Sequence, residues 1–388
     1  MEKTVRTMTE LIAYEVCGKG LDTGLSFESD EELAALYRLA KAHDLAHLVG
    51  DALLKNDLVA NEEIKAKFEK QRMLALYRYE KIKYELDRLR EVFNGAKIPF
   101  IPLKGAVLRK YYPEPWMRTS CDVDILVQEC DLERATGLLT DRLSYRKDSK
   151  GSHDVGFYSD GGVHIELHYS LIEENCVGKA EKVLGAVWEK ASAVGGTSEY
   201  LLDGDMFYCY HIAHMAKHFV STGGCGIRPF LDLWVLDHRI GYDREGRERP
   251  LDAGGLLSFS CEAEALSEVW FGDMPHTETT GRMEDYILRG GVYGTVKGRV
   301  AVQQVKRGGK FRYALSRIWL PYDLLRFYYP SLEGRRVLLP AYEVRRWCSL
   351  LFCGGAKRSM RELRLNSATT AAERERTREM LSRLGLDD

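Results

Sequence analysis

The stretch IPFIPLKGAVLRKYYPEPWMRTSCDVDILV, residues 98–127, has the clearest structural pattern in the chain. It predicts a strand over 98–103, followed by a glycine turn and a short helix from about 105 to 111. A proline-marked loop comes next, and a second apolar strand is predicted over 122–127. These elements form the predicted core of the protein.

Two aspartates open the second strand. Asp122 and Asp124 are two positions apart, and alternate side chains of a strand point to the same face. Their mutual repulsion is costly unless a cation lies between them, and hard carboxylate oxygens suit Mg²⁺ or Mn²⁺. The pair therefore indicates a metal site at the mouth of a buried strand. The alternative is an acidic strand end that faces solvent.

A third carboxylate lies on a later predicted strand. The runs 153–159 and 163–170 alternate apolar and polar residues and are joined by Asp-Gly-Gly, a typical hairpin turn. Glu166 and His168 share the polar face of the second run. We expect the hairpin to bring Glu166 beside the two aspartates, where it could complete a metal site.

Taken in order, these motifs resemble the uncharacterised nucleotidyltransferase family of the DNA polymerase β-like superfamily. The resemblance runs from about residue 30 to about residue 350. It rests on Leu103-Lys-Gly105, Arg118, Ser120, Asp122-Val-Asp124, Ile165-Glu-Leu-His168, His214-Met-Ala-Lys-His218, Gly226-Ile-Arg-Pro-Phe-Leu-Asp232 and Leu288-Arg-Gly-Gly-Val-Tyr-Gly294.

The resemblance implies an α+β protein in which a small mixed β-sheet carries the three carboxylates. It implies transfer of a nucleoside monophosphate from an NTP, with ATP favoured, to an acceptor hydroxyl and release of pyrophosphate. Asp122, Asp124 and Glu166 would hold two Mg²⁺ (or Mn²⁺) ions, which position phosphates and activate the attacking hydroxyl. The acceptor is left open as a small molecule, a protein or an RNA end.

Four further residues are expected to contact the nucleotide phosphates. Gly105 stands at a helix start, where backbone amides can approach a phosphate group. Lys104 supplies a cation, and Arg118 suits bidentate contact with phosphate. Ala106 follows the glycine where the superfamily usually has a serine. Lys104 or Ser120 is expected to compensate for the missing hydroxyl.

Helical patterns flank the predicted core. The longest covers 62–93, whereas 241–250 and 273–281 are expected to be loops. We expect three segments: an N-terminal helical region (1–95), a nucleotidyltransferase core (96–200) and a C-terminal helical region (201–388).

The predicted helix 205–220 has three histidines on one face. No His-Glu-X-X-His motif or cysteine at ligand spacing accompanies them, so a zinc site is not favoured. Arg228 and Asp232, four positions apart on the next helix, could form an ion pair. We expect polar groups from these elements at the cleft, drawn from His168, His214, Lys217, Arg228 and Asp232.

The composition fits a globular cytoplasmic protein. The chain has 388 residues, a formal net charge of −2 and nine cysteines without a Cys-X-X-Cys pair. Its first residues lack the apolar segment of a secretory signal, and no apolar run reaches the ~20 residues of a membrane span. Residues 299–347 hold eleven Lys and Arg against three Asp and Glu, interleaved with aromatics. Nucleic acid is thus a possible partner but not the favoured one, and the oligomeric state is not indicated.

Two alternatives to a housekeeping enzyme are open. One is a non-catalytic module that keeps the fold and binds nucleotide as a scaffold. The other is a toxin-like nucleotidyltransferase of a toxin–antitoxin pair. The presence of all three carboxylates favours an enzyme, because a degenerate copy has no need to keep them.

Overall fold

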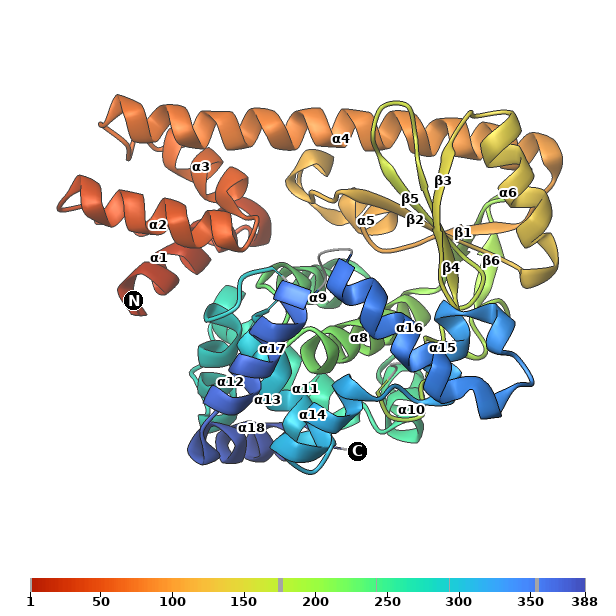
Figure 1. Ribbon diagram of the computed structural model, residues 1–388. Helices are drawn as coiled ribbons and strands as arrows, with labels where there is room; N and C mark the ends of the chain where they lie inside the picture. The colour runs from red at the N-terminus through yellow and green to blue at the C-terminus, as the bar shows by residue number, and fades with distance from the viewer. Residues whose placement is uncertain (1, 174–176, 242, 293, 353–355, 388) are drawn as a thin grey trace.

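The computed structural model describes residues 2–173, 177–241, 243–292, 294–352 and 356–387. Tyr293, part of one resembling motif, therefore lies outside the described residues. A small mixed sheet is preceded and followed by helices (Figure 1). The predicted α+β fold is confirmed.

The elements follow one another along the chain in three groups. The first helices are α1 Glu2–Ile12, α2 Asp30–Ala42, α3 Ala46–Lys55 and α4 Glu62–Ala96. The middle group is β1 Phe100–Pro102, α5 Gly105–Leu108, β2 Asp122–Val127, α6 Leu132–Asp141, β3 Arg146–Lys150, β4 Asp154–Tyr158, β5 His164–His168, α7 Ala180–Leu184, β6 Ala191–Ala193 and β7 Tyr200–Leu202. The last helices are α8 Gly204–Ser221, α9 Arg228–Arg239, α10 Arg244–Gly254, α11 Leu257–Phe271, α12 Glu278–Leu288, α13 Val296–Lys306, α14 Lys310–Ile318, α15 Tyr322–Tyr328, α16 Leu339–Phe352, α17 Ala356–Ala368 and α18 Ala371–Arg383.

The main sheet has the strand order β1-β2-β5-β4-β3. Strands β2 and β5 are parallel neighbours, and the other adjacent pairs are antiparallel. The register places Asp124 opposite Glu166. The predicted hairpin and its position beside the aspartate strand are thus confirmed. Strand β3 was not predicted, because its exposed polar residues show no apolar alternation.

The strand alternation gives the sheet two different faces. Val123, Ile125 and Ile165 belong to an apolar cluster that includes residues of α4 and α6. Asp122 and Asp124 lie on the opposite face of β2, as the spacing predicts. Burial of each such aliphatic side chain contributes about 1.5–3 kcal/mol, which fixes the register and therefore the side on which the carboxylates emerge.

Helix α4 connects two parts of the molecule (Figure 1). Asn61 caps its first turn by accepting hydrogen bonds from Glu63 N and Ile64 N. Its early residues pack with the N-terminal helices, and its later residues, such as Phe93, pack under the sheet. The helix continues past residue 93, where the predicted pattern ends, and stops at Ala96, where Lys97 adopts a left-handed conformation.

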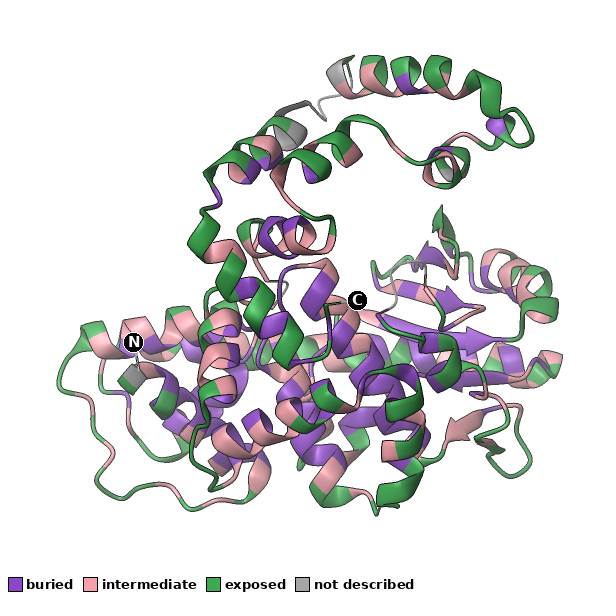
Figure 2. Ribbon diagram, turned by 90° about the horizontal axis from the view of Figure 1, so that it is seen from below, coloured by how far each residue is buried: buried purple, intermediate pink, exposed green. Residues whose placement is uncertain are grey.

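The apolar core forms two clusters. The larger one joins the N-terminal helices to the helices after the sheet, and the smaller one lies between the sheet, α4 and α6. Figure 2 shows buried residues concentrated on the central helices and on the strands of the sheet. Much of the region 310–350 is exposed. The predicted three-segment division of the chain stays a prediction.

The predicted loop over 241–250 is wrong. Asp243 caps helix α10, and Arg247 inside it is buried between Asp205 and Asp237 at 3.1 and 2.5 Å. The charged residues that made this segment resemble a connector are therefore partly tertiary ion-pair partners.

Smaller boundary errors occur elsewhere. Helix α12 starts inside the second predicted loop, at Glu278, because Thr277 and Thr280 form a capping box. The helix predicted over 105–111 is shorter, since α5 ends at Leu108 and a 3₁₀ turn follows. No helix in the described ranges is long and apolar enough to cross a membrane.

A buried histidine generates the first prediction. His43 is 0% exposed, and neither ring nitrogen has a hydrogen-bond partner among the residues that the structure describes. Burial lowers its pKa to about 4. The unfolded chain binds this proton below about pH 6.5, so lowering the pH from 7.5 to 5 removes about 2 kcal/mol of stability through His43 alone.

We expect His43→Leu to keep most of that stability at pH 5, as measured by urea unfolding at both pH values. His276→Leu, at a half-exposed position, is the matched control and should lose stability as the wild type does. An unchanged acid loss in His43→Leu would show that His43 is not the titrating group.

Candidate active site

The turn between β1 and α5 holds Lys104 in an unusual backbone conformation. Its φ and ψ are 43° and −121°, a region that residues other than glycine rarely occupy. Such a conformation costs about 1–3 kcal/mol and persists only where surrounding contacts enforce it. Here Leu103 N donates to Asp124 O at 3.0 Å, and Lys104 Nζ pairs with Asp124 Oδ1 at 2.7 Å. The strained turn thus carries the lysine onto the aspartate strand.

Asp124 is the centre of the cluster. Its side chain is 3% exposed, and Oδ1 also accepts a hydrogen bond from His168 Nε2 at 3.0 Å. The same histidine nitrogen lies 3.4 Å from Glu166 Oε2. Two carboxylates on neighbouring parallel strands therefore share one imidazole, and one of them also binds a lysine.

The charges of this cluster support one another. Burial would raise the pKa of Asp124, but the charge of Lys104 and the hydrogen bond from His168 hold it well below its usual value. Burial would likewise lower the pKa of His168, but hydrogen bonds to Asp124 and Glu166 raise it to about 9. At neutral pH Asp124 is ionised and His168 is protonated, so both are kept in charged form inside the protein.

Asp122 has a different environment. Burial and the neighbouring charge of Asp124 raise the pKa of Asp122 to about 6, against the opposing effect of Lys104. The two aspartates titrate as an interacting pair, in which Asp124 holds its charge and Asp122 takes up the proton. Additional positive charge at the cluster would favour the ionised form of Asp122.

The donor set fits a divalent cation. Ligand atoms of Asp124, Glu166 and His168 lie within 4.8 Å of one another, and Asp122 is not part of this group. The carboxylate oxygens suit Mg²⁺ or Mn²⁺, whereas the imidazole is a ligand only in its neutral form. The predicted set of Asp122, Asp124 and Glu166 stays a prediction. His168 is the neighbour that links two of these carboxylates.

Helix α8 contributes polar groups from the C-terminal helical region. His218 Nε2 lies 3.0 Å from His214 Nε2, and Lys217 pairs with Glu173. Burial, followed by the charge of Lys104, lowers the pKa of His214 well below its usual value. Two of the expected cleft residues, His214 and Lys217, thus lie on the helix turn that faces the carboxylate cluster.

The other two expected cleft residues hold the loop before β2. Asp232 is 0% exposed and accepts hydrogen bonds from Arg118 Nε at 2.6 Å and Tyr112 Oη at 2.7 Å. Arg228 donates to Thr119 O at 2.8 Å and pairs with Asp44 at 3.2 Å. The predicted ion pair between Arg228 and Asp232 is therefore wrong, because each binds a partner outside α9.

Gly105 and Ser120 meet beneath the strained turn. Arg109 Nε donates to Gly105 O at 2.6 Å, and its Nη2 donates to Ser120 Oγ at 3.0 Å. A Cβ atom on Gly105 would lie 3.2 Å from Ser120 Oγ, so a side chain there would crowd this contact. Phosphate contacts by Lys104, Gly105, Arg118 and Ser120 stay predictions.

Several neighbours of the cluster were not predicted from the sequence. His153 stacks on His168 with ring centroids 5.9 Å apart, and its Nε2 lies 3.3 Å from Glu173. Asp44 comes from the turn after α2 and reaches Thr119. The alternation of polar residues around β4 and β5 could have flagged His153. Asp44 is too distant in sequence to be found without the fold.

The Arg118–Asp232 pair generates the second prediction. Arg118→Met should lower the free energy of unfolding by about 3–5 kcal/mol, because it leaves the buried carboxylate of Asp232 with one fewer positive partner. Asp232→Asn should cost much less in the Arg118→Met background than in the wild type. Chemical unfolding of the single and double variants measures this coupling.

Arg134→Met is the matched control, because Arg134 is 55% exposed and lies 3.7 Å from Asp131. It should change the free energy of unfolding by less than about 1 kcal/mol. Wild-type stability of Arg118→Met would contradict the structural role of the pair.

Comparison with known proteins identifies the family of the chain. Searches of curated proteins and of solved structures found no match to the chain. A family model described as "Uncharacterised nucleotidyltransferase" matches residues 29–272, which is more than half of the chain and includes β2, β5, α8 and α9. The chain belongs to this uncharacterised nucleotidyltransferase family.

Proposed function

We propose that the protein is a Mg²⁺- or Mn²⁺-dependent enzyme that transfers a nucleoside monophosphate from an NTP to an acceptor hydroxyl and releases pyrophosphate. The family match supports nucleotidyl transfer in general. The observation that carries the finer proposal is the parallel pairing of β2 with β5, which sets Asp124 opposite Glu166 on the sheet face that bears Asp122.

The proposed role of the carboxylates, metal binding, depends on their lying close together. Asp122, Asp124 and Glu166 would hold the divalent cations. When bound, these cations would neutralise phosphate charge and lower the pKa of the attacking hydroxyl. Phosphoryl chemistry depends mainly on such positioning and charge stabilisation, so no covalent nucleophile is required of the protein. Glu166, whose side chain is 26% exposed, would meet the acceptor.

The cations of the cluster have a matching role. Lys104 is 22% exposed at its side chain, more than its partner Asp124, and would contact the triphosphate of the donor. His168 would keep Glu166 and Asp124 oriented through its shared hydrogen bonds. The histidines and lysine of α8 would form the far wall of the cleft.

The proposed donor and acceptor come from the family resemblance. ATP is the proposed NTP, and a small molecule, a protein or an RNA end is the proposed class of acceptor. The acceptor hydroxyl would approach from the side of Glu166. A scaffold that binds nucleotide without turnover is the competing outcome of the experiments below.

Removal of the aspartates generates the third prediction. Asp122→Asn/Asp124→Asn should abolish the Mg²⁺-dependent part of the stabilisation that ATP gives the protein in thermal unfolding, since a ligand bound only to the folded state stabilises it by RT ln(1 + [L]/Kd). It should also abolish release of pyrophosphate. Asp148→Asn, on the exposed strand β3, is the matched control and should behave as the wild type.

Equal thermal shifts in the wild type and the double variant would exclude the metal assignment. A Mg²⁺-dependent shift without pyrophosphate release from any NTP, with a panel of acceptors, would favour the scaffold function instead.

The lysine on the strained turn generates the fourth prediction. Lys104→Met should weaken ATP binding in the presence of Mn²⁺ by at least tenfold, about 1.4 kcal/mol. Metal binding alone should change less, because the carboxylates are intact. Titration calorimetry with ATP measures the effect, and the exposed neighbour Lys110→Met is the control. Unchanged ATP affinity in Lys104→Met would rule out its contact with phosphate.

A further inference from the structure

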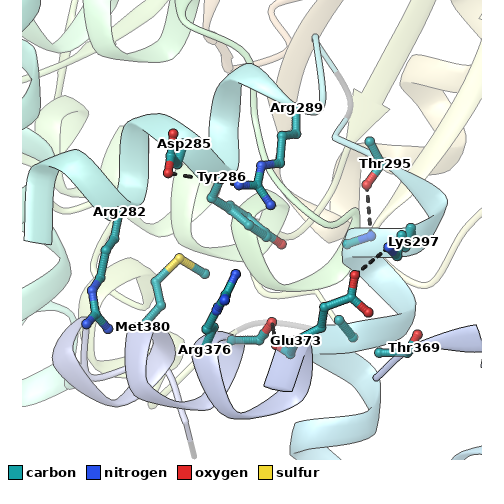
Figure 3. A pocket seen from close by; sticks show the side chains of 13 residues that line it. Arg282, Asp285, Tyr286, Arg289, Thr295, Lys297, Thr369, Glu373, Arg376 and Met380 are labelled. Carbon is teal, nitrogen blue, oxygen red and sulfur yellow. Dashed lines mark hydrogen bonds and ion pairs between the residues drawn. The ribbon is translucent and has the colours of Figure 1, made fainter. Parts of the chain in front are cut away.

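A pocket lies in the C-terminal helical region, away from the carboxylate cluster. Residues of α12, α13 and α18 line most of it, and its volume is about 540 Å³ (Figure 3). Ligand sites for small molecules typically measure about 300–1,000 Å³. All lining residues lie beyond residue 272, where the family match ends. The family's own chemistry therefore does not account for this pocket.

The lining is rich in positive charge. Four cationic side chains face two carboxylates: Arg282, Arg289, Lys297 and Arg376 against Asp285 and Glu373. Arg282 and Lys297 are neutralised by close ion pairs with glutamates.

The other two arginines form fewer ion pairs. Among the described residues, the ion pair of Arg289 is a 3.9 Å contact with the exposed Asp285. For Arg376 no hydrogen bond or ion pair occurs among the described residues. Figure 3 shows these two side chains entering the pocket from opposite sides. Two guanidinium groups are thus available to one anion, and guanidinium geometry matches phosphate oxygens.

The opposite part of the lining is apolar and contains one unpaired hydroxyl. Tyr286, Ala301 and Met380 supply a ring, a methyl group and a thioether. The Tyr286 hydroxyl is buried and has no hydrogen-bond partner within the described part of the chain. Figure 3 shows this ring between Arg289 and Arg376. An apolar wall beside two weakly paired arginines suits a phosphate group joined to an organic body.

The turn after α8 packs closely against the start of α13, which lines the pocket. Gly223 has a φ of +84°, and a Cβ atom there would meet Arg299 N at 2.1 Å and Thr295 O at 2.6 Å. The turn that ends α8 is therefore seated directly on the first turn of α13. Thr295 also caps α13 through Gly298 N, at 2.8 Å. These contacts form the pocket wall without a ligand and connect it to the helix that bears His214 and Lys217.

We propose that this pocket binds a phosphate-bearing organic molecule of about nucleotide size, independently of the carboxylate cluster. Arg289 and Arg376 bind the phosphate, and the apolar wall holds the organic part. The ligand is either a nucleotide of the proposed reaction or another organic phosphate, and both share this chemistry.

The test uses AMP as the probe, titrated into the full-length protein in EDTA so that no divalent cation is present. Adenosine and inorganic phosphate are the companion probes. The variants are Arg289→Gln/Arg376→Gln and, separately, Asp122→Asn/Asp124→Asn. Arg378→Gln is the control, because Arg378 lies on the same helix as Arg376, pairs with Glu375 at 2.8 Å and does not line the pocket.

AMP is expected to bind the wild type, the aspartate variant and Arg378→Gln with equal affinity, and Arg289→Gln/Arg376→Gln at least tenfold more weakly. Binding to the wild type should fall with added salt. Adenosine should not bind, and inorganic phosphate should bind more weakly than AMP. Ribose 5-phosphate, titrated in parallel, separates recognition of a nucleotide from recognition of any organic phosphate.

Three results would overturn the proposal. The first is no AMP binding to the wild type at 10 mM, and the second is loss of binding in the aspartate variant alone. The third is unchanged binding in the arginine variant. Thermal unfolding midpoints verify that each variant is folded, and both arginines are exposed at the pocket rim.

Discussion

The ion-paired hydrogen bonds of Asp124 are the interaction on which the rest of the site depends. A buried carboxylate is stable only when positive partners compensate for the loss of water, and Lys104 and His168 fill this role from two different elements. The lysine arrives through a strained turn, and the histidine arrives because β5 runs parallel to β2. The same arrangement sets Asp124 opposite Glu166, and the proposed metal site depends on this pairing.

Elements outside the sheet fix this arrangement. The loop before β2 is tied to α9 through Asp232 and Arg228, so the C-terminal helices determine how the aspartate strand begins. Helix α8 carries His214 and Lys217. The turn after α8 packs against the first turn of α13, a helix that lines the pocket of the C-terminal helical region. The sheet that bears the carboxylates is therefore linked by packing contacts to helices beyond the family match.

Much of this could be predicted from the sequence. The alternation around Asp122, Asp124 and Glu166 specified two strands, their polar face and the hairpin, because strand periodicity is a local property. The partners of Arg118, Arg228 and Arg247 could not be predicted, since ion pairs between distant elements leave no periodic signal. The same limit explains why the charged segment 241–250 is predicted as a loop, whereas tertiary contacts stabilise it as part of helix α10.

The most direct test counts the metal ions. Electron paramagnetic resonance can measure free Mn²⁺ during a titration of the protein with a non-hydrolysable ATP analogue, and the bound number per chain follows by difference. The account predicts two bound Mn²⁺ ions per chain with the analogue, and loss of both when Asp122 and Asp124 are replaced by asparagine. No Mn²⁺ bound beyond that held by the analogue alone would contradict it.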